Sequence, residues 1–303
     1  MDALIVLRHV RVENANAVAG LTWGFPAVSS FLGFVHALSR ELSPRVGFAM
    51  NGCGIICHRT QLLAHRPRGW DDYVFSLTRN PPINRKQVEE LKKGKPPSFN
   101  EEGRMHMEVT LVIPCFGELD DDIEPVSLKQ QIMRQALSMR LAGGTITGIG
   151  DVDLIEPPET GQEMRVFERK QLGKLLPGFA LVLRSDALAE HVNRTSESSA
   201  DAEPVDAWLD FAALKYQAEK PEDDAPEKQQ SVEWRYVPKP AGGWLVPLAI
   251  GYRGISKLYR PGEVSRVRDG ETPFRFVEAV YSVGEWISPH RVGNLRQLIW
   301  RYD

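Results

Sequence analysis

The stretch ALIVLRHVRV (residues 3–12) decides the fold of the first half of the chain. Its branched apolar residues favour a β-strand. The acid at Asp2 and the shortness of the apolar run argue against a signal peptide. No apolar run elsewhere in the sequence reaches the length of a membrane span. We therefore expect a protein without a membrane segment that opens with a strand.

A helix is expected after this strand and a loop rich in glycine and proline. Its apolar residues recur at the spacing of one helical face, namely Phe31, Phe34, Val35, Leu38 and Leu42. Ser29 or Ser30 is the expected N-cap, and Pro44 the expected end. Residues 45–64 then predict one or two strands, interrupted by a turn at 52–54.

Residues 65–103 break this pattern, because they contain five prolines and many charges. They predict an arm outside the core, with a short helix near 85–93. The alternation in 104–114 predicts the next strand. A second helix is expected to begin at a Ser127 cap and to end at Gly143-Gly144. Its expected inner face consists of Leu128, Ile132, Ala136 and Leu137.

A last strand over residues 145–156 completes the order strand, helix, strand, arm, strand, helix, strand. This order predicts an α+β fold with a ferredoxin-like or RNA-recognition-motif core over 1–156, carrying the arm at 65–103. One sheet face would be covered by helices and the other free to meet RNA. Residues 157–303 are expected to form a C-terminal α/β extension, with an acidic, partly disordered linker at 193–232 around a helix in DAWLDFAALKY.

The formal net charge of −3 conceals an uneven distribution. Residues 195–233 carry a charge of −8 and residues 118–124 a charge of −5, so the rest of the chain carries +10. A basic body with acidic loops is typical of an RNA-binding protein. Acids that simply collect in solvated loops would give the same distribution.

Metal and cofactor sites are not expected. Cys53, Cys57 and His58 lie close in sequence, but no second ligand pair follows at zinc-finger spacing. In an extended segment the two cysteines would share one face and His58 would point to the other. Three cysteines form no even disulfide framework, so a reducing cytoplasm is the expected setting. Neither a Walker loop nor a G-x-S-x-G motif occurs.

RNA cleavage is the catalytic alternative. His36, His58, His106 and His290 could supply a general acid and a general base on paper. RNA binding is better supported, because the last third of the chain interleaves aromatic residues with arginine. Four aromatic residues, Trp23, Phe25, Trp244 and Tyr252, stand in segments rich in glycine and proline. We expect these four to form a partner interface.

Several stretches resemble a known family. They are LTWGFPAVSSFLGFVHAL (21–38), SLTRNPP (76–82), EEGRMHMEVTL (101–111), MRLAGGTI (139–146), LLPGFALV (175–182), GWLVPLAIGY (243–252) and the run LYRPGEVSRVRDGETPFRFVEAVYSVGEWISPHR (258–291). In this order they are similar to the second subunit of type I-F CRISPR (Csy) surveillance complexes, a repeat-associated mysterious protein of the Cas-five class.

The resemblance implies a non-catalytic RNA-binding subunit that serves antiviral defence by holding the 5′ handle of the guide RNA. It also implies that the arm at 65–103 is a thumb projecting from a modified RNA-recognition-motif core. Further implications are pairing with the large subunit, contact with the adjacent backbone subunit, and only indirect contact with target DNA. The matching positions with RNA-suited groups are Asn14, Asn16, Arg79, Asn80, Arg104, Arg140, Arg268, His290 and Arg291. The glycine-rich C-terminal loop usual among such proteins is missing.

Two rival hypotheses come from other classes. The first is a metal-independent endoribonuclease that processes precursor guide RNA, as a type I-C relative of this subunit does. The second is a protein-interaction scaffold whose basic surface serves only solubility. Cleavage of a repeat RNA would identify the first. The absence of salt-dependent binding to a handle RNA would identify the second.

Overall fold

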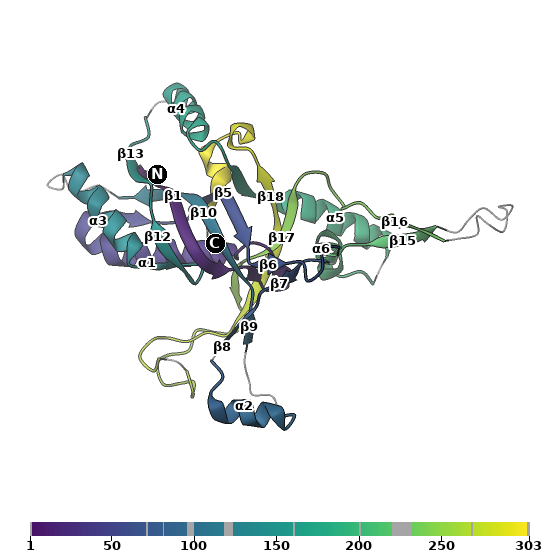
Figure 1. Ribbon diagram of the computed structural model, residues 1–303. Coiled ribbons are helices and arrows are strands. Elements are labelled where there is room, and N and C mark those ends of the chain that lie inside the picture. Colours follow the sequence, from purple (N-terminus) through teal and green to yellow (C-terminus); the bar gives the residue numbers. More distant parts are fainter. Residues whose placement is uncertain are drawn as a thin grey trace.

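The computed structural model describes residues 2–70, 72–80, 82–95, 100–117, 124–159, 161–199, 201–219, 232–267 and 269–301. These residues form an α+β fold around one large antiparallel sheet, which confirms the predicted class (Figure 1). In spatial order its strands are β11 (Arg140–Leu141), β12 (Gly144–Gly148), β1 (Ala3–Asn16), β10 (Arg104–Phe116), β5 (Cys53–Leu62), β14 (Phe179–Leu183), β18 (Val277–Ile287) and β17 (Leu245–Gly254). Short strands pair beside this path, namely β13 (Asp151–Ile155) with β1, β4 (Ala49–Met50) with β10 and β19 (Ile299–Trp300) with β5.

The helices α1 (Val28–Val46) and α3 (Pro125–Leu137) cover one face of this sheet. The predicted inner face of α1 is buried as expected, from Phe31 to Leu42. In α3, Leu128, Ile132 and Ala136 are buried, whereas Leu137 is 40% exposed and does not belong to the inner face. The alternate residues of β1 and β10 pack against these helices, because successive side chains of a strand point to opposite faces.

The opposite face of the sheet is covered only in part. Leu4, Val6 and Val112 pack there against α4 (Gly161–Gly173) and against the short helical turns η2 (Pro289–Arg291) and η3 (Leu295–Leu298). Beyond these elements the same face carries polar side chains. Arg11 of β1 and Glu108 of β10 lie on the same face as Leu4 and Val112, but farther from α4. The part of the face that α4, η2 and η3 leave uncovered, over β1, β10 and β5, is called the open face below.

Three predicted helix ends differ from the structure. Pro44 lies inside α1, which continues to Val46 and ends at Gly47 in a left-handed conformation with φ of 78°. Burial of Leu42 and Phe48 on either side of Pro44 offsets the one backbone hydrogen bond that proline removes. No serine caps α1 through its side chain, and α3 begins at Pro125, ahead of Ser127. A proline in the first helical turn costs no bond, because that N–H lacks a helical partner in any case.

The expected C-cap at Gly143-Gly144 is a strand turn. The helix α3 ends at Ser138, and Ala142 and Gly143 take φ angles of 51° and 73° between β11 and β12. Two successive residues with positive φ are typical of the tight turn of a β-hairpin. The single strand expected over 145–156 is accordingly two strands, β12 and β13. Each pairs with β1, β12 at its residues 11–13 and β13 at its residues 4–8.

The predicted arm projects away from the sheet (Figure 1). Its stem contains two short ribbons, β6 (Ala64–His65) with β7 (Val74–Phe75) and β8 (Thr78–Asn80) with β9 (Asn100–Glu102). Its tip is the expected helix, α2 (Arg85–Lys92), which buries no residue. Local bonds rather than packing stabilise α2, since the side chains of Asn84 and Gln87 cap each other's backbone N–H.

The second half of the chain adds strands to the same sheet and helices beside it. The additions outside the sheet are α5 (Ser185–Ser198), α6 (Pro204–Ala212) and a ribbon of β15 (Tyr216–Glu219) with β16 (Glu233–Tyr236). The predicted helix in DAWLDFAALKY is α6, and its Trp208 and Phe211 are buried against Val283 of β18. Beside these, β2 (Val18–Ala19) pairs with β3 (Thr22–Trp23). No helix within the described ranges is long and apolar enough to cross a membrane.

Candidate nucleic-acid interface

A shallow polar groove of about 240 Å³ lies on the open face. The register places Arg11 of β1 opposite Glu108 of β10, and Glu108 opposite Arg59 of β5, so these three residues form one row across three strands. The remaining polar side chains of the groove are Glu13, Gln61, His106 and Thr147. The groove therefore presents cations and hydrogen-bonding groups at the middle of the sheet.

The two arginines of this row are available to a ligand. Both are exposed, and neither guanidinium makes a hydrogen bond or ion pair with another residue that the structure describes. Gly148 faces Arg11 in the register, and a Cβ on Gly148 would lie 2.5 Å from the Arg11 guanidinium. Arg11 can lie across β12 only because that position has no side chain.

The acid of the row is already paired. Glu108 Oε1 lies 2.7 Å from Nδ1 of His9. The His9 ring stacks on the His58 ring at a centroid distance of 4.4 Å. Thr110 joins the two histidines, since its hydroxyl accepts the backbone N–H of His9 and lies 2.7 Å from Nε2 of His58. This pairing reduces the repulsion that a bare carboxylate would exert on a phosphate in the groove.

The histidines do not form an acid and base pair. Nδ1 of His58 lies 2.5 Å from the Pro177 carbonyl oxygen, so both ring nitrogens of His58 are engaged. Burial lowers the pKa of His58, which favours its neutral form. Nδ1 of His106 accepts the backbone N–H of Asn14, so the neutral ring carries its proton on Nε2, where it donates rather than accepts. His36, an alternative considered above, lies on the exposed side of α1.

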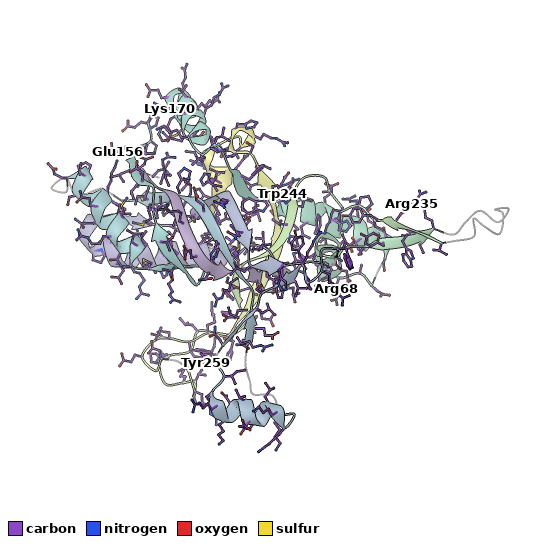
Figure 2. The ribbon with its side chains drawn as sticks, viewed as in Figure 1. Arg68, Glu156, Lys170, Arg235, Trp244 and Tyr259 are labelled. Carbon is purple, nitrogen blue, oxygen red and sulfur yellow. The ribbon has the colours of Figure 1, made fainter. Side chains whose placement is uncertain are left out.

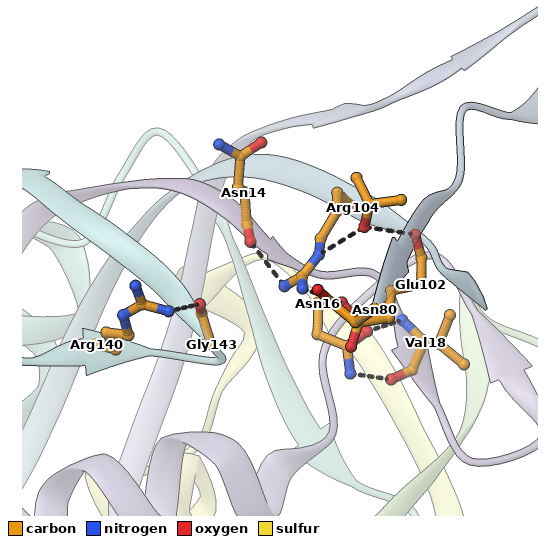
Figure 3. Close-up of polar contacts among 9 residues, drawn as sticks. Asn14, Asn16, Val18, Asn80, Glu102, Arg104, Arg140 and Gly143 are labelled. Carbon is orange, nitrogen blue, oxygen red and sulfur yellow. Dashed lines mark hydrogen bonds and ion pairs between the residues drawn. The ribbon is translucent and has the colours of Figure 1, made fainter. Parts of the chain in front are cut away.

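Several residues predicted to contact RNA meet where the arm joins the sheet (Figure 3). Arg104 donates to the backbone oxygen of Asn14 at 3.2 Å and forms an ion pair with Glu102. Asn80 donates to the same carboxylate at 2.8 Å. Asn14 has a positive φ of 56°, at a bulge in the pairing of β1 with β10. We call Asn14, Asn80, Glu102 and Arg104 the arm junction.

The arm junction is held together by its own contacts. Asn16, beside it, bonds the backbone of Val18 through both its amide nitrogen and its amide oxygen. Arg140 reaches the Gly143 carbonyl oxygen at 3.5 Å. Arg79 pairs with Glu101 across the stem of the arm at 3.1 Å. A ligand would have to compete with Glu101 for Arg79 and with Glu102 for Asn80 and Arg104.

The other predicted RNA residues lie elsewhere. His290 and Arg291 belong to η2, which packs beside α4 at the opposite end of the sheet from the arm in Figure 1. Both are exposed, and Nδ1 of His290 lies 2.7 Å from the Ser288 hydroxyl. Arg268 lies outside the described residues. The structure thus gathers six of the nine positions at or beside the arm junction, namely Asn14, Asn16, Arg79, Asn80, Arg104 and Arg140, and separates His290 and Arg291 from them.

Three of the four residues predicted for a partner interface line one cavity of about 620 Å³. Trp23 and Phe25 reach it from the segment after β2, and Trp244 reaches it from the segment before β17. Trp244 lies near the centre of the molecule in Figure 2. Tyr252 is not part of the lining and is 62% exposed on β17. Arg59 lines both this cavity and the groove.

The cysteines have a structural role. Cys53 and Cys57 face the helix-covered core while His58 faces the other side, as the alternation predicts. Burial raises the pKa of Cys57 to about 11 and that of Cys115 to about 12, so these thiols stay protonated near neutral pH. Across the described part of the chain, no three His, Cys, Asp or Glu side chains gather as metal ligands.

The sequence interpretation missed Arg11, Arg59, Gln61 and Thr147. A usable signal was present for Arg11, because Val10 and Val12 on either side of it are apolar and a strand alternates its faces. No such signal existed for Arg59, since a bulge between Cys57 and Arg59 shifts the alternation of β5 by one residue.

Comparison with known proteins identifies the family. The family model described as CRISPR-associated protein (Cas_Csy2) matches residues 5–303. The chain belongs to the Cas_Csy2 family. It is 38% identical over 307 residues to the CRISPR-associated protein Csy2 of Pseudomonas aeruginosa (strain UCBPP-PA14), and the alignment covers 99% of this chain and 91% of that relative. The groove, the arm junction and the aromatic cavity all lie within the matched range of this Cas_Csy2 protein.

Proposed function

We propose that this protein is a non-catalytic RNA-binding subunit of a type I-F CRISPR (Csy) surveillance complex. In this proposal it holds the 5′ handle of the guide RNA, pairs with the large subunit and contacts the adjacent backbone subunit. Membership of the Cas_Csy2 family and the 38% identity to a Csy2 protein support its place in such a complex. Target DNA is read by base pairing with the guide, so the protein meets it indirectly.

The observation that carries the RNA-binding role is the row of Arg11, Glu108 and Arg59 on the open face. Two exposed guanidinium groups flank a carboxylate whose Oε1 is already bonded to Nδ1 of His9. Arginine binds phosphate through parallel N–H bonds and stacks on unpaired bases. The neighbouring side chains Gln61, His106 and Thr147 supply donors and acceptors, and Glu13 adds a second carboxylate to the groove.

The fold supports this use of the open face. The strands β13, β1, β10 and β5 lie side by side in that order, and in chain order they are the fourth, first, third and second main strands. Together with α1 and α3 on one face, this strand order supports the proposal of a ferredoxin-like or RNA-recognition-motif core of the repeat-associated mysterious protein class. Such cores bind single-stranded RNA on the face opposite the helices. In this proposal 1–156 is the core and 157–303 the extension.

The arm junction continues the proposed RNA surface from the groove toward the arm. His106 belongs to the groove and bonds Asn14 of the junction, so the two sites are contiguous. A phosphate arriving at Arg104 would replace Glu102 as its partner, which is an exchange of one charged contact for another. Asn16, Arg79 and Arg140 shape this surface, while His290 and Arg291 of η2 form a second expected contact region. Arg268 remains an expected contact outside the described residues.

The partner surface is proposed to include Tyr252 and the loop that joins β17 to β18. Ile255, Leu258 and Phe276 of this loop are between 48% and 60% exposed. Exposed apolar side chains gathered on one projection mark a protein interaction site. Arg253 and Lys257 stand among them, which suits a partner surface with acidic groups at its rim.

Co-purification tests the proposed function directly. The full chain would be expressed with an affinity tag, together with the large subunit of its complex, a guide RNA precursor and a separate endonuclease that matures this precursor, and the bound nucleic acid sequenced. We expect one discrete guide RNA and the large subunit to be recovered together. Recovery of the large subunit with no guide RNA would reject the RNA-binding role, and recovery of cleaved precursor by the chain alone would support the endoribonuclease rival.

A further inference from the structure

The aromatic cavity of about 620 Å³ opens beside the groove. Its walls come from residues 21–26, the end of β5, α6, and the strands β17 and β18. We infer that this cavity receives one unstacked base of the single-stranded RNA whose backbone lies in the groove. The inference rests on the proposed function and names the group that the cavity takes.

The rings around the cavity are arranged as a binding surface. Trp23 is 53% exposed and packs on Phe75 at a centroid distance of 4.6 Å. Trp244 is 58% exposed and packs on Phe179 at 5.3 Å. Each indole is therefore held by one neighbouring ring while much of its surface stays open. Rigid, exposed aromatic rings stack on nucleobases without a sequence requirement.

The position of Trp23 depends on a residue without a side chain. A Cβ on Gly103 would lie 3.2 Å from the Trp23 ring and 3.3 Å from the Phe75 ring. The close approach of the β9–β10 junction supports the indole from behind. Phe25, on the other side, packs edge-on against the buried Trp286 at 4.9 Å. The rings at the cavity are thus anchored to the core rather than free to rearrange.

The charges around the cavity suit a polyanion. Its lining contains the cations Arg59 and Lys239 but neither Asp nor Glu. Lys239 donates to the backbone carbonyl groups of Phe211 and Ala213, which fixes its ammonium group at the wall. Desolvation lowers the pKa of Lys239, and a phosphate nearby would raise this pKa again because it stabilises the charged ammonium group.

Arg59 connects the cavity with the groove, because it lines both. An RNA strand that lies along Arg11 and Arg59 would pass the mouth of the cavity. A base turned out of the stack at that point would enter between the indoles while its phosphate stayed at Arg59. An apolar side chain of a partner protein would fill the same space, but it would leave the cations without a counter-charge.

The test measures binding of fluorescein-labelled 5′-handle RNA to the full chain by anisotropy, with an abasic site placed at each position in turn. We expect one position to lose about tenfold in affinity, since a stacked base contributes roughly that much. Trp244→Ala should cause a similar loss, and in that variant the abasic site should have no further effect. Trp244→Phe should keep most of the affinity, because it keeps a ring.

Trp234→Ala is the matched control, because Trp234 is 68% exposed on β16 and outside the cavity lining. Its handle affinity should equal that of the parent. If every abasic RNA binds the parent as tightly as intact RNA, the inference is wrong while the proposed function stands. If Trp23→Ala and Trp244→Ala release the large subunit but bind RNA normally, the occupant is protein. If intact handle RNA does not bind at all, the proposed function itself fails.

Discussion

The hydroxyl of Thr110 lies 2.7 Å from Nε2 of His58. Because it also accepts the backbone N–H of His9, this hydroxyl has its own proton free to donate to His58. Nδ1 of His58 then carries the ring proton and donates it to the Pro177 carbonyl oxygen. This arrangement links β10 and β5 to the segment before β14, and a neutral imidazole with its proton on Nδ1 satisfies both contacts.

The stability of the protein should therefore depend on pH near the pKa of histidine. Burial lowers the pKa of His58 in the folded state, so the unfolded chain binds a proton more readily. The groups that face His58 are His9, Glu108 and Arg8. The free energy of unfolding should fall as the pH drops from about 7.5 to about 5.5. Urea unfolding of the full chain across this range measures the slope.

Two variants assign this slope. His58→Asn removes the titrating group and should flatten the dependence on pH, whatever its effect on stability at pH 7.5. His36→Asn, on the exposed side of α1, should leave the slope as it is in the parent. An equal slope in His58→Asn and the parent would show that other groups are responsible.

The chain should not cleave RNA. Both nitrogens of His58 are bonded, and the free nitrogen of neutral His106 carries a proton, so neither ring offers a base to a ribose hydroxyl. Incubation of the full chain with an end-labelled repeat RNA, in chelator, should leave the RNA intact on a denaturing gel. Cleavage at one position that disappears in His106→Ala would overturn this prediction.

The arm should be the first segment that a protease attacks. The helix α2 buries no residue, so only its Asn84–Gln87 capping box and local ion pairs hold it. Limited trypsin digestion of the full chain should cut near Lys92 and Lys93. Asn84→Ala should accelerate this cut, because loss of an N-cap costs about 0.5–2 kcal/mol. Asn294→Ala, at the cap of η3, should not change the rate of cleavage in the arm. Resistance of the parent protein to trypsin at α2 would contradict this prediction.

The edge of the sheet beside the groove should tolerate no side chain at Gly144. A Cβ there would lie 2.7 Å from the Glu13 carbonyl oxygen and 2.8 Å from the Ala15 amide nitrogen, and backbone atoms cannot yield. Gly144→Ala should destabilise the fold by about 1–3 kcal/mol in thermal or urea unfolding. Gly173→Ala is the matched control, since nothing lies within 4 Å of its Cβ position. Equal stability of the two variants would show that the sheet edge adjusts.

The sequence predicted much of the fold because its signals were local. The apolar periodicity of Phe31 to Leu42 and of Leu128 to Ala136 depends only on helix geometry, and both helices are present. The ends were missed where packing outweighs local preference. Pro44 stays helical because Leu42 and Phe48 on either side of it are buried, and Gly143 turns a hairpin because β12 pairs with β1.

The site was less predictable, since its residues come together only through the sheet. One row across the sheet contains Arg11, Glu108 and Arg59. Arg11 and Glu108 are 97 positions apart in the sequence, and a bulge in β5 brings Arg59 opposite Glu108. The partners of Arg104 and Asn80 were equally hidden, because Glu102 reaches them through the β8–β9 ribbon. Trp23 and Trp244 were selected for exposure alone, and their shared cavity depends on the placement of β17 beside β18.

The most direct test of the account is the salt dependence of handle-RNA binding in arginine variants. If Arg11 and Arg59 each hold a phosphate, the double variant Arg11→Ala/Arg59→Ala should bind less tightly and lower the slope of log affinity against log salt by about two. Arg40→Ala, exposed on the helix-covered side of the sheet, should match the parent in affinity and slope. A double variant with the parent's affinity and slope would contradict the claim that the open face binds RNA.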